Sequence, residues 1–538
     1  MIRIGQLKIR TGHTKEELEK KIEHTLGVTK GDIQSIQIRK RSIDARKKPD
    51  IYYVYTIDVE LVKVKKEKMI LTRRRNKNLS EAREALYQFP NSGSILMEHR
   101  PVIVGSGPAG LFCALMLARH GYRPLLIERG APVEERKKAV ETFWETGVLD
   151  TRTNVQFGEG GAGTFSDGKL NTLVKDPDGR NREVLKIFVE HGAPENILYE
   201  NKPHIGTDVL IDVVRRIRET IESLGGECRF YTKLTGIRTR DDILREIQIE
   251  EQGKEYWIPA DTVVLAPGHS ARDTFRMLDE SGVFLEPKSF AVGVRVEHLQ
   301  ERINLSQYGT KKHPDLPAAA YKLTAKAGNG RGVYTFCMCP GGYVVNASSE
   351  KGRLCVNGMS YHGRAGKNAN SAVIVTVNQE DYASFGKGPL AGVAFQRYLE
   401  ERAYKAGLGE IPVQCFGDFK EGRISESFGE VIPQMKGAYR FGNVRGIFPE
   451  EIALSIQEGI EAFEKKIHGF SRDDTVLSGV EARTSSPVRI TRDETMESVR
   501  IRGLYPCGEG AGYAGGITSA AMDGIRTAEA IAKKYQPF

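Results

Sequence analysis

The sequence has few cysteines and no long uninterrupted apolar run. Its seven cysteines are an odd number spread over 538 residues, which excludes the disulfide scaffold of small secreted proteins and indicates a reducing compartment. The longest apolar stretch, residues 102–118, contains Pro108 and several glycines and is shorter than the ~20 residues that a membrane-spanning helix needs. The first residues lack the apolar core of a signal peptide. We therefore expect a cytoplasmic protein without a membrane span.

Common catalytic signatures are also missing. The sequence contains no Walker phosphate loop, no HExxH zinc motif and no recognisable Ser–His–Asp arrangement. These absences argue against a P-loop nucleotide hydrolase, a zinc peptidase and a serine hydrolase. No metal site is predicted.

Positive charge is concentrated near the N-terminus. The formal net charge is +9, and residues 1–90 contain 22 Lys and Arg against 12 Asp and Glu. The basic stretches Lys63–Lys68 and Arg73–Arg75 would suit the phosphates of a nucleic acid. The segment lacks the aromatic-rich stretch of an RNA-recognition domain. A nucleic-acid partner and an ordinary solvated surface both stay open.

Residues 1–62 show the pattern of a small α+β domain. An alternating strand comes first. A capping box at Thr14 then begins a helix, and Gly27 ends it. Two further strands follow, the first over residues 33–39. Residues 63–99 are charged and are expected to be an irregular linker.

A glycine-rich turn follows the buried strand of residues 101–104. The turn reads Gly-Ser-Gly-Pro-Ala-Gly over residues 105–110, and a helix is predicted over residues 109–120. The unpaired N–H groups at the start of such a helix attract phosphates.

The glycines of this turn have separate uses. Gly105 permits the tight turn, Gly107 lets the backbone approach a pyrophosphate, and Gly110 lets the helix pack against the strand. Glu128 ends the next strand, ~20 residues further on, where an acid accepts hydrogen bonds from ribose hydroxyls. The unit is therefore predicted to bind the ADP half of a dinucleotide.

Further elements continue this α/β pattern. Residues 207–224 form an amphipathic helix. Strands over 228–231, 234–240 and 243–251 are expected to form a β-meander. Residues 290–480 contain mixed strands and many glycines but no second dinucleotide motif.

Two later segments carry a family resemblance. Residues 262–269 read Thr-Val-Val-Leu-Ala-Pro-Gly-His, and residues 503–524 form a strand, a glycine-rich loop and the start of a last helix. With the 102–128 unit, they make the sequence resemble the glutathione-reductase-like two-dinucleotide-binding-domain flavoproteins. The closing motif of that family usually has Asp where Glu509 stands, so the contact of this carboxylate with the ribityl chain is open.

The resemblance covers about residues 100–290 and 480–538 and implies non-covalently bound FAD. The whole chain also resembles bacterial uncharacterised FAD-dependent dehydrogenases of the NAD(P)/FAD-dependent oxidoreductase family. Residues 157–170, 335–342 and 357–360 carry that narrower resemblance. It implies no settled substrate.

The predicted cofactor site combines these segments. Bare backbone in the glycine run 158–168 would lie close to the ribityl chain or the isoalloxazine. N–H groups at the start of the last helix would stabilise negative charge on reduced flavin. The predicted FAD-binding residues are Gly105, Ser106, Gly107, Pro108, Ala109, Gly110, Glu128, Arg129, Gly161, Gly163, Thr164, Ser166, Lys169, Leu234, Ala266, Pro267, Gly268, Gly508, Glu509, Gly516, Ile517 and Thr518.

Four residues are candidates for the chemistry on the substrate. Cys337 and Cys339 would face one side of a strand and form either a redox or metal pair or two buried structural thiols. Arg483 would bind a substrate carboxylate or phosphate, or else form an ordinary ion pair. His204 is either an acid–base group or a loop histidine without a function. His269 and His362 have the same ambiguity.

The expected fold class is α/β: a Rossmann-like FAD-binding domain with a parallel sheet and a β-meander, an inserted α+β cap domain and a small N-terminal α+β domain. The expected boundaries are 1–90, 100–289, 290–480 for the cap, and 481–538 for the closing segment. The predicted function is hydride transfer between FAD and an unidentified small substrate, with NAD(P)H as a transient donor. The alternative is a flavin-containing, nucleic-acid-associated or RNA-modifying protein. The sequence predicts no oligomeric state.

Overall fold

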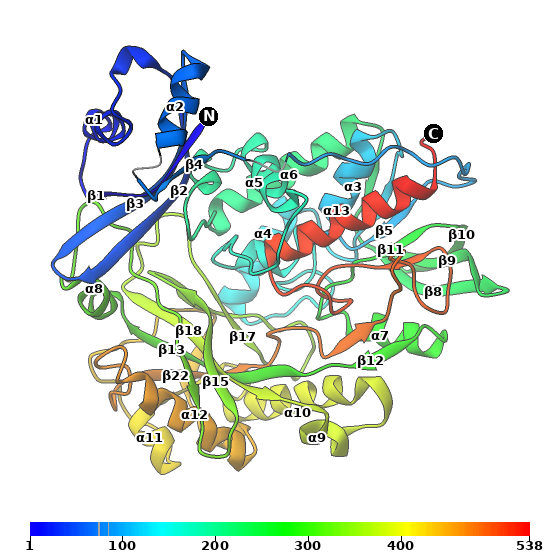
Figure 1. Ribbon diagram of the computed structural model, residues 1–538. Helices are drawn as coiled ribbons and strands as arrows, with labels where there is room; N and C mark the ends of the chain where they lie inside the picture. The colour runs from blue at the N-terminus through cyan, green and yellow to red at the C-terminus, as the bar shows by residue number, and fades with distance from the viewer. Residues whose placement is uncertain (74–75, 84–85) are drawn as a thin grey trace.

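A computed structural model describes residues 1–73, 76–83 and 86–538. Its centre is a five-stranded parallel sheet with the order β24-β11-β5-β6-β7. The strands are Val102–Val104 (β5), Leu125–Ile127 (β6), Glu227–Arg229 (β7), Val263–Leu265 (β11) and Leu504–Pro506 (β24). The two ends of the main domain therefore meet in one sheet (Figure 1). Together with the other sheets, this confirms the predicted α/β class.

Both faces of the parallel sheet are covered. Ile103, Leu126 and Val264 pack against helices, whereas their neighbours Val102 and Val104 pack against the opposite layer. The helical layer consists of α3 (Pro108–Arg119), α5 (Arg180–Glu190), α6 (Thr207–Ser223) and α13 (Ile517–Lys534). This two-sided burial explains why β5, β6 and β11 consist of apolar residues without alternation, whereas the edge strand β7 is half-buried and contains Glu227 and Arg229.

The opposite layer is an antiparallel sheet of β8 (Thr232–Arg240), β9 (Ile243–Glu251) and β10 (Lys254–Pro259). The predicted β-meander therefore exists, but one of its expected strands was wrong. The segment at residues 228–231 contributes β7 to the parallel sheet, beside β6. Alternating apolar residues indicate that a segment is a strand, but they do not indicate to which sheet the strand belongs.

The cap segment contains a seven-stranded sheet with the order β14-β15-β18-β13-β22-β19-β21. Its strands are β13 (Phe290–Leu299), β14 (Thr324–Lys326), β15 (Gly332–Cys339), β18 (Asn368–Val377), β19 (Ile411–Cys415), β21 (Tyr439–Phe441) and β22 (Val476–Glu481). A smaller sheet joins β16 (Tyr343–Asn346), β17 (Val356–Met359) and β20 (Met435–Lys436). Helices α10 (Ala391–Ala406) and α12 (Glu450–Phe463) pack on the large sheet.

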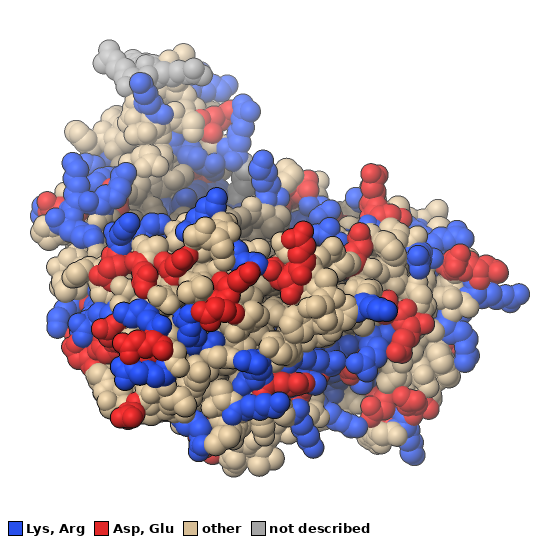
Figure 2. Space-filling view, turned by 90° about the horizontal axis from the view of Figure 1, so that it is seen from below, with Lys and Arg blue, Asp and Glu red and all other residues tan. Residues whose placement is uncertain are grey.

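The chain enters and leaves the cap segment at one place. Strand β12 (Leu285–Pro287) pairs with β23 (Val488–Ile490). The cap segment lies below the parallel sheet in Figure 1. The face seen from below carries interspersed side chains of both charges (Figure 2).

The N-terminal sheet has the order β2-β3-β1-β4. Its elements are β1 (Ile2–Arg10), α1 (Lys15–Leu26), β2 (Ile33–Lys47), β3 (Asp50–Leu61), α2 (Val64–Arg73) and β4 (Leu79–Glu81). The predicted capping box at Thr14 and the left-handed Gly27 after α1 are confirmed.

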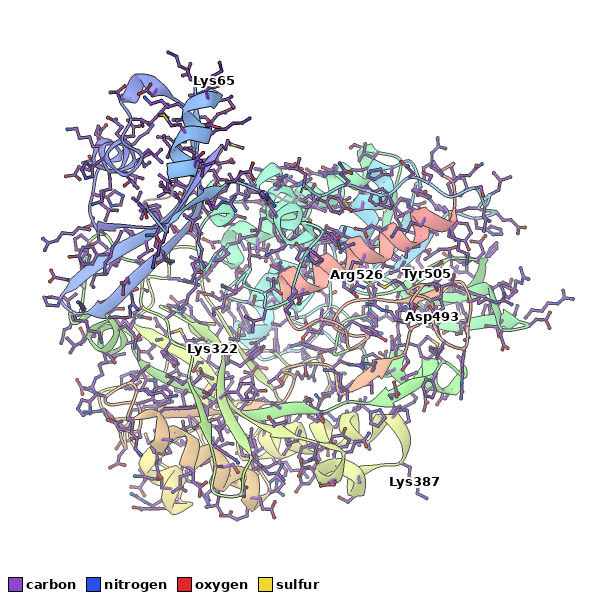
Figure 3. The ribbon with its side chains drawn as sticks, in the orientation of Figure 1. Lys65, Lys322, Lys387, Asp493, Tyr505 and Arg526 are labelled. Atoms are coloured by element: carbon purple, nitrogen blue, oxygen red, sulfur yellow. The ribbon has the colours of Figure 1, made fainter. Side chains whose placement is uncertain are left out.

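Two expectations for this region were wrong. Strand β2 continues to Lys47, because it pairs with β3 along a long hairpin. The expected irregular linker begins with α2, whose exposed Lys65 points to solvent, as Figure 3 shows. Arg74, Arg75 and the side chain of Arg73 lie outside the described residues. No helix among the described residues has the length and apolar character needed to cross a bilayer.

Candidate functional site

A cavity of about 300 Å³ lies between the parallel sheet and the cap segment. It begins at the glycine turn after β5 and passes the start of α13. Its far wall comes from β15, β17 and β22 of the cap segment. Its volume is at the lower end of the range for small-molecule sites.

The three glycines of the turn after β5 have different surroundings. A Cβ on Gly105 would lie 2.2 Å from the Ala266 carbonyl oxygen, and one on Gly110 would lie 1.8 Å from the Gly105 carbonyl oxygen. These two glycines permit close packing of backbone. A Cβ on Gly107 would meet no atom closer than 3.9 Å. Because Gly107 lines the cavity, a side chain there would fill the space in front of α3, which fits a site for a diphosphate.

A second glycine loop packs on this turn. The Gly160 amide donates to the Ser106 carbonyl over 2.9 Å, and a Cβ on Gly161 would lie 3.0 Å from the Gly107 Cα. Bare backbone of the run 158–168 therefore packs on the turn after β5, and its close approach to the ribityl chain or the isoalloxazine stays a prediction.

Arg136 of α4 (Val133–Thr146) holds the second glycine loop. Its guanidinium is completely buried and donates to five backbone carbonyls, those of Asn154, Val155, Gly158, Glu159 and Gly161, over 2.6 to 3.3 Å. Burial lowers its pKa to about 10, although Glu128 and Glu159 oppose that shift. The sequence does not single out Arg136, because this residue stands in a charged helical stretch that resembles a surface helix.

Glu128 connects the two loops. One carboxylate oxygen accepts hydrogen bonds from the amide and hydroxyl of Ser106, at 3.0 and 2.8 Å, and the other accepts from the amides of Gly130 and Gly158. A carboxylate has about four acceptor positions, and the hydrogen bonds from the two loops already fill those of Glu128. Its contact with a ribose stays a prediction, and its organisation of the loops was not anticipated.

The start of α13 forms the opposite end of the cavity. Gly515, Gly516, Ile517 and Ala520 line it, and a Cβ on Gly515 or Gly516 would meet nothing within 4 Å. The first N–H groups of a helix have no intrahelical acceptor and carry partial positive charge. This end therefore suits an electron-rich group.

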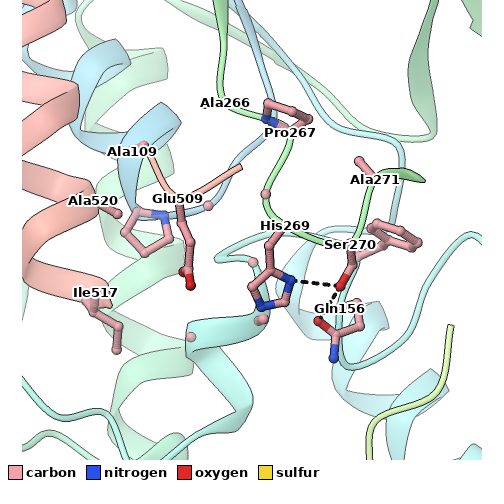
Figure 4. A pocket seen from close by; sticks show the side chains of 18 of the residues that line it. Ala109, Gln156, Ala266, Pro267, His269, Ser270, Ala271, Glu509, Ile517 and Ala520 are labelled. Carbon is pink, nitrogen blue, oxygen red and sulfur yellow. Dashed lines mark hydrogen bonds between the residues drawn. The ribbon is translucent and has the colours of Figure 1, made fainter. Parts of the chain in front are cut away.

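A hydrogen-bond chain fixes the tautomer of His269 (Figure 4). Gln156 Nε2 donates to the Ala347 carbonyl over 3.1 Å, so its Oε1 accepts from Ser270 Oγ over 3.0 Å. Ser270 has then used its proton, and Nδ1 of His269, 2.9 Å away, must donate to it. Nε2 is left as an acceptor. Burial, Arg483 and Arg272 lower the pKa of His269 to about 3, which keeps the ring neutral.

Glu509 points into the cavity near His269 in Figure 4. Its carboxyl takes no hydrogen bond from the described residues. Burial raises its pKa to about 7, and the charge of Lys288 opposes that shift. Near neutral pH this carboxyl is therefore partly protonated.

Arg483 lines the cavity but is already paired. Its Nε and Nη2 each donate to Glu400 over 2.8 Å, and its Nη1 donates to Ser349 Oγ. Arg272 binds the same carboxylate with two further hydrogen bonds. Both arginines lower the pKa of Glu400 against the effect of burial. Of the two roles expected for Arg483, the geometry favours the ion pair over the binding of a substrate carboxylate or phosphate.

Cys337 lines the cavity and Cys339 is buried behind it. A β-bulge between Phe336 and Cys339 interrupts the pairing of β15 with β18, and Cys337 has φ of 42°. The regular alternation that was expected to direct both thiols to one side is therefore absent here.

His204 does not line the cavity. Its backbone pairs with that of Lys169, and its ring stacks on His362 with centroids 5.3 Å apart. Burial and the charge of Arg364 lower its pKa to about 4. A role as an acid or base at the cavity would require a rearrangement.

Most predicted cofactor residues line the cavity. Those that do not are Ser106, Gly110, Thr164, Gly508 and Thr518. Cavity residues that the sequence analysis did not propose for the site include Gln156, Phe157, Asp167, Asn171, Lys233, Ser270, Phe336, Asn357, Glu481 and Thr484. They come from many separate segments. Phe157, Asp167, Phe336 and Asn357 stand in the stretches that carry the narrower family resemblance, and the other six stand outside the motifs described above.

Three family descriptions match separate parts of the chain. Residues 99–284 match pyridine nucleotide-disulphide oxidoreductases, and residues 289–484 match the C-terminal domain-like part of FAD-dependent proteins. Residues 1–60 match a domain of unknown function. An uncharacterized protein of Clostridium beijerinckii is 49% identical over 538 residues, which cover 99% of each chain.

Two solved structures show weaker similarity. A flavin-dependent brominase variant is 14% identical over 80% of this chain and 79% of that chain, with a TM-score of 0.35. Glycine oxidase from Bacillus cereus is 11% identical over 81% of this chain and 95% of that chain, with a TM-score of 0.32.

Proposed function

Because the chain belongs to the NAD(P)/FAD-dependent oxidoreductase family, we propose that it is an FAD-dependent enzyme that transfers a hydride between the flavin and a small substrate. Family membership supports FAD as the cofactor. The observation that carries the proposal is the continuous cavity, which joins the open face of Gly107 to the start of α13 and to the cap strands.

Each end of the cavity suits one part of FAD. The ADP part would lie along Glu128 and the glycine turn, with its diphosphate in front of Gly107 and the start of α3. The flavin ring would lie at Gly516 and Ile517, where the positive end of α13 stabilises negative charge. When bound, FAD supplies the two-electron chemistry, and the protein binds and orients it.

The cap strands would hold the substrate. Phe336, Cys337 and Asn357 line the cavity from this side, and Asp167 and Lys169 line it from the glycine loop. Asp167 is buried and paired with Arg364 and Lys169. Two cations and one carboxylate leave one net positive charge in this cluster beside the cavity, which would suit a negatively charged group on the substrate. Since the sequence has a single dinucleotide motif, NAD(P)H would visit this side only transiently.

The N-terminal sheet gives little support to the RNA alternative. Several of its basic side chains are paired with carboxylates. These pairs are Arg3 and Arg39 with Asp58, Lys8 and Arg46 with Asp44, and Arg41 with Glu200. Paired charges release fewer counterions from a nucleic acid than free ones.

Two measurements on the purified protein test the proposal. Denaturation should release one FAD per chain, identified by its mass and visible spectrum. Anaerobic addition of NADH, NADPH and a panel of small reduced metabolites should bleach the flavin with at least one donor at a turnover rate. A protein whose flavin resists every donor would favour a structural role for the cofactor.

A further inference from the structure

Cys337 and Cys339 lie together at the β-bulge of β15. The Cys339 thiol donates to the Cys337 carbonyl oxygen over 3.2 Å, and the two thiols also interact with each other. Residues two apart in a chain have Cα atoms at most roughly 7 Å apart, and a disulfide spans up to about 6.8 Å. The backbone turn at Cys337, with φ of 42°, replaces the usual alternation and leaves one thiol at the cavity and the other behind it.

Two cations hold this short segment. Arg295 donates from Nη1 to the Cys337 carbonyl over 2.9 Å, and its Nη1 lies 4.0 Å from the Cys339 sulfur. Lys169 donates to the carbonyl of Met338, the residue between the cysteines. The Cys339 thiol and the charges of Lys169 and Arg295 lower the pKa of Cys337 well below its usual value, against the effects of burial and of Asp167. A thiolate in such surroundings is the nucleophilic form of cysteine.

The pair faces the proposed flavin site. Cys337 lines the same cavity as Gly516 and Ile517, where the flavin ring is proposed to bind. Cys339 is completely buried, so an external partner reaches the pair only through Cys337 and the cavity. Among the described residues, no group of three metal-ligating side chains exists, so the structure gives no support to the metal-pair alternative.

We propose that Cys337 and Cys339 form a dithiol–disulfide couple that exchanges two electrons with the flavin. This inference rests on the proposed function, because it needs a flavin in the cavity. Because Cys339 is completely buried and Cys337 is half-buried, an outside thiol or disulfide partner would have to react at Cys337.

The reaction balances without another reagent. The Cys337 thiolate and the Cys339 thiol form a sulfur–sulfur bond and lose two electrons and the Cys339 proton. The oxidised cofactor takes up the two electrons and one proton. In the opposite direction, the reduced cofactor returns them, the disulfide breaks, and Cys339 regains its proton.

Anaerobic dithionite titration of the holoprotein tests the couple. The protein is first oxidised with diamide and then freed of it. The wild type should take up four electrons per FAD, two for the flavin and two for the disulfide. Cys337→Ser and Cys339→Ser should each take up two. Cys228→Ser is the matched control, because Cys228 is also half-buried but lies on β7, and it should retain the value of four.

A second readout uses the wild type alone and needs no variant to fold. After diamide treatment, the peptide that contains both cysteines should be two hydrogens lighter and resist N-ethylmaleimide. After full reduction it should gain two maleimide groups. A flavin-containing protein that takes up two electrons, with both thiols still open to alkylation, would overturn the couple and leave the proposed function intact. A protein unable to bind FAD would overturn both.

Discussion

The backbone of Gly161 lies against the backbone of Gly107, so that a Cβ on Gly161 would stand 3.0 Å from the Gly107 Cα. Two loops from separate parts of the sequence thus form one surface without side chains. Arg136 donates to carbonyls of the second glycine loop, and Glu128 accepts from amides of both loops. The proposed diphosphate site depends on this arrangement.

Gly107→Val should weaken FAD binding by about 100-fold or more, which corresponds to roughly 2.7 kcal/mol. The new side chain would fill the open space in front of α3, and the backbone of Gly107, with φ of −70° and ψ of −179°, accepts a valine without strain. Equilibrium dialysis against FAD measures the effect. Gly31→Val is the control, because a Cβ there meets nothing within 4 Å and Gly31 does not line the cavity. Equal FAD affinity in both variants would remove Gly107 from the site.

Arg136→Met should destabilise the protein by at least about 3 kcal/mol, because five buried carbonyls lose their donor. Urea unfolding measures this loss. FAD should protect the variant less than the wild type, since the glycine loop is no longer fixed. Lys137→Met on the exposed side of α4 should leave both quantities unchanged. A fully stable Arg136→Met protein would show that the second glycine loop keeps its conformation without Arg136.

The FAD affinity of the wild type should fall as the pH rises through about 7. Glu509 has its pKa raised to about 7 by burial, so it is neutral below that pH and gains a negative charge above it. That charge would repel the diphosphate of FAD. Glu509→Gln cannot ionise and should bind FAD with the same affinity at pH 6 and pH 8, values roughly one unit on each side of that pKa. Titration of flavin fluorescence follows the binding, and a parallel fall in wild type and variant would assign the effect to another group.

Arg483→Gln should cost about 3 kcal/mol of stability, because it leaves one side of the buried Glu400 without its hydrogen bonds. Arg489→Gln is the matched control on the exposed face of β23. Thermal unfolding of both variants gives the comparison. A stable Arg483→Gln protein that binds FAD but loses turnover would restore the role of Arg483 as a substrate ligand.

Local patterns in the sequence predict the elements that local chemistry determines. The turn at residues 105–110, the capping box at Thr14 and helix α6 each follow from short-range steric or hydrogen-bonding rules, and the structure contains them. Strand β7 was assigned to the wrong sheet, because its neighbour β6 lies about a hundred residues earlier in the sequence.

Long-range contacts explain what the sequence analysis could not predict in the site. The relay from Gln156 through Ser270 to His269 joins two segments and a carbonyl of the cap. Arg483 donates two of its three hydrogen bonds to Glu400, on a helix that carries no motif. The bulge at Cys337 arises from pairing with β18, which an alternation rule does not contain.

A crystal structure of the protein as purified would show whether the cavity binds FAD in the proposed orientation. We expect density for FAD with its diphosphate against Gly107 and the start of α3 and its ring against Gly516 and Ile517, within reach of Cys337. Density for a different molecule, or FAD bound with its ring away from α13, would contradict it.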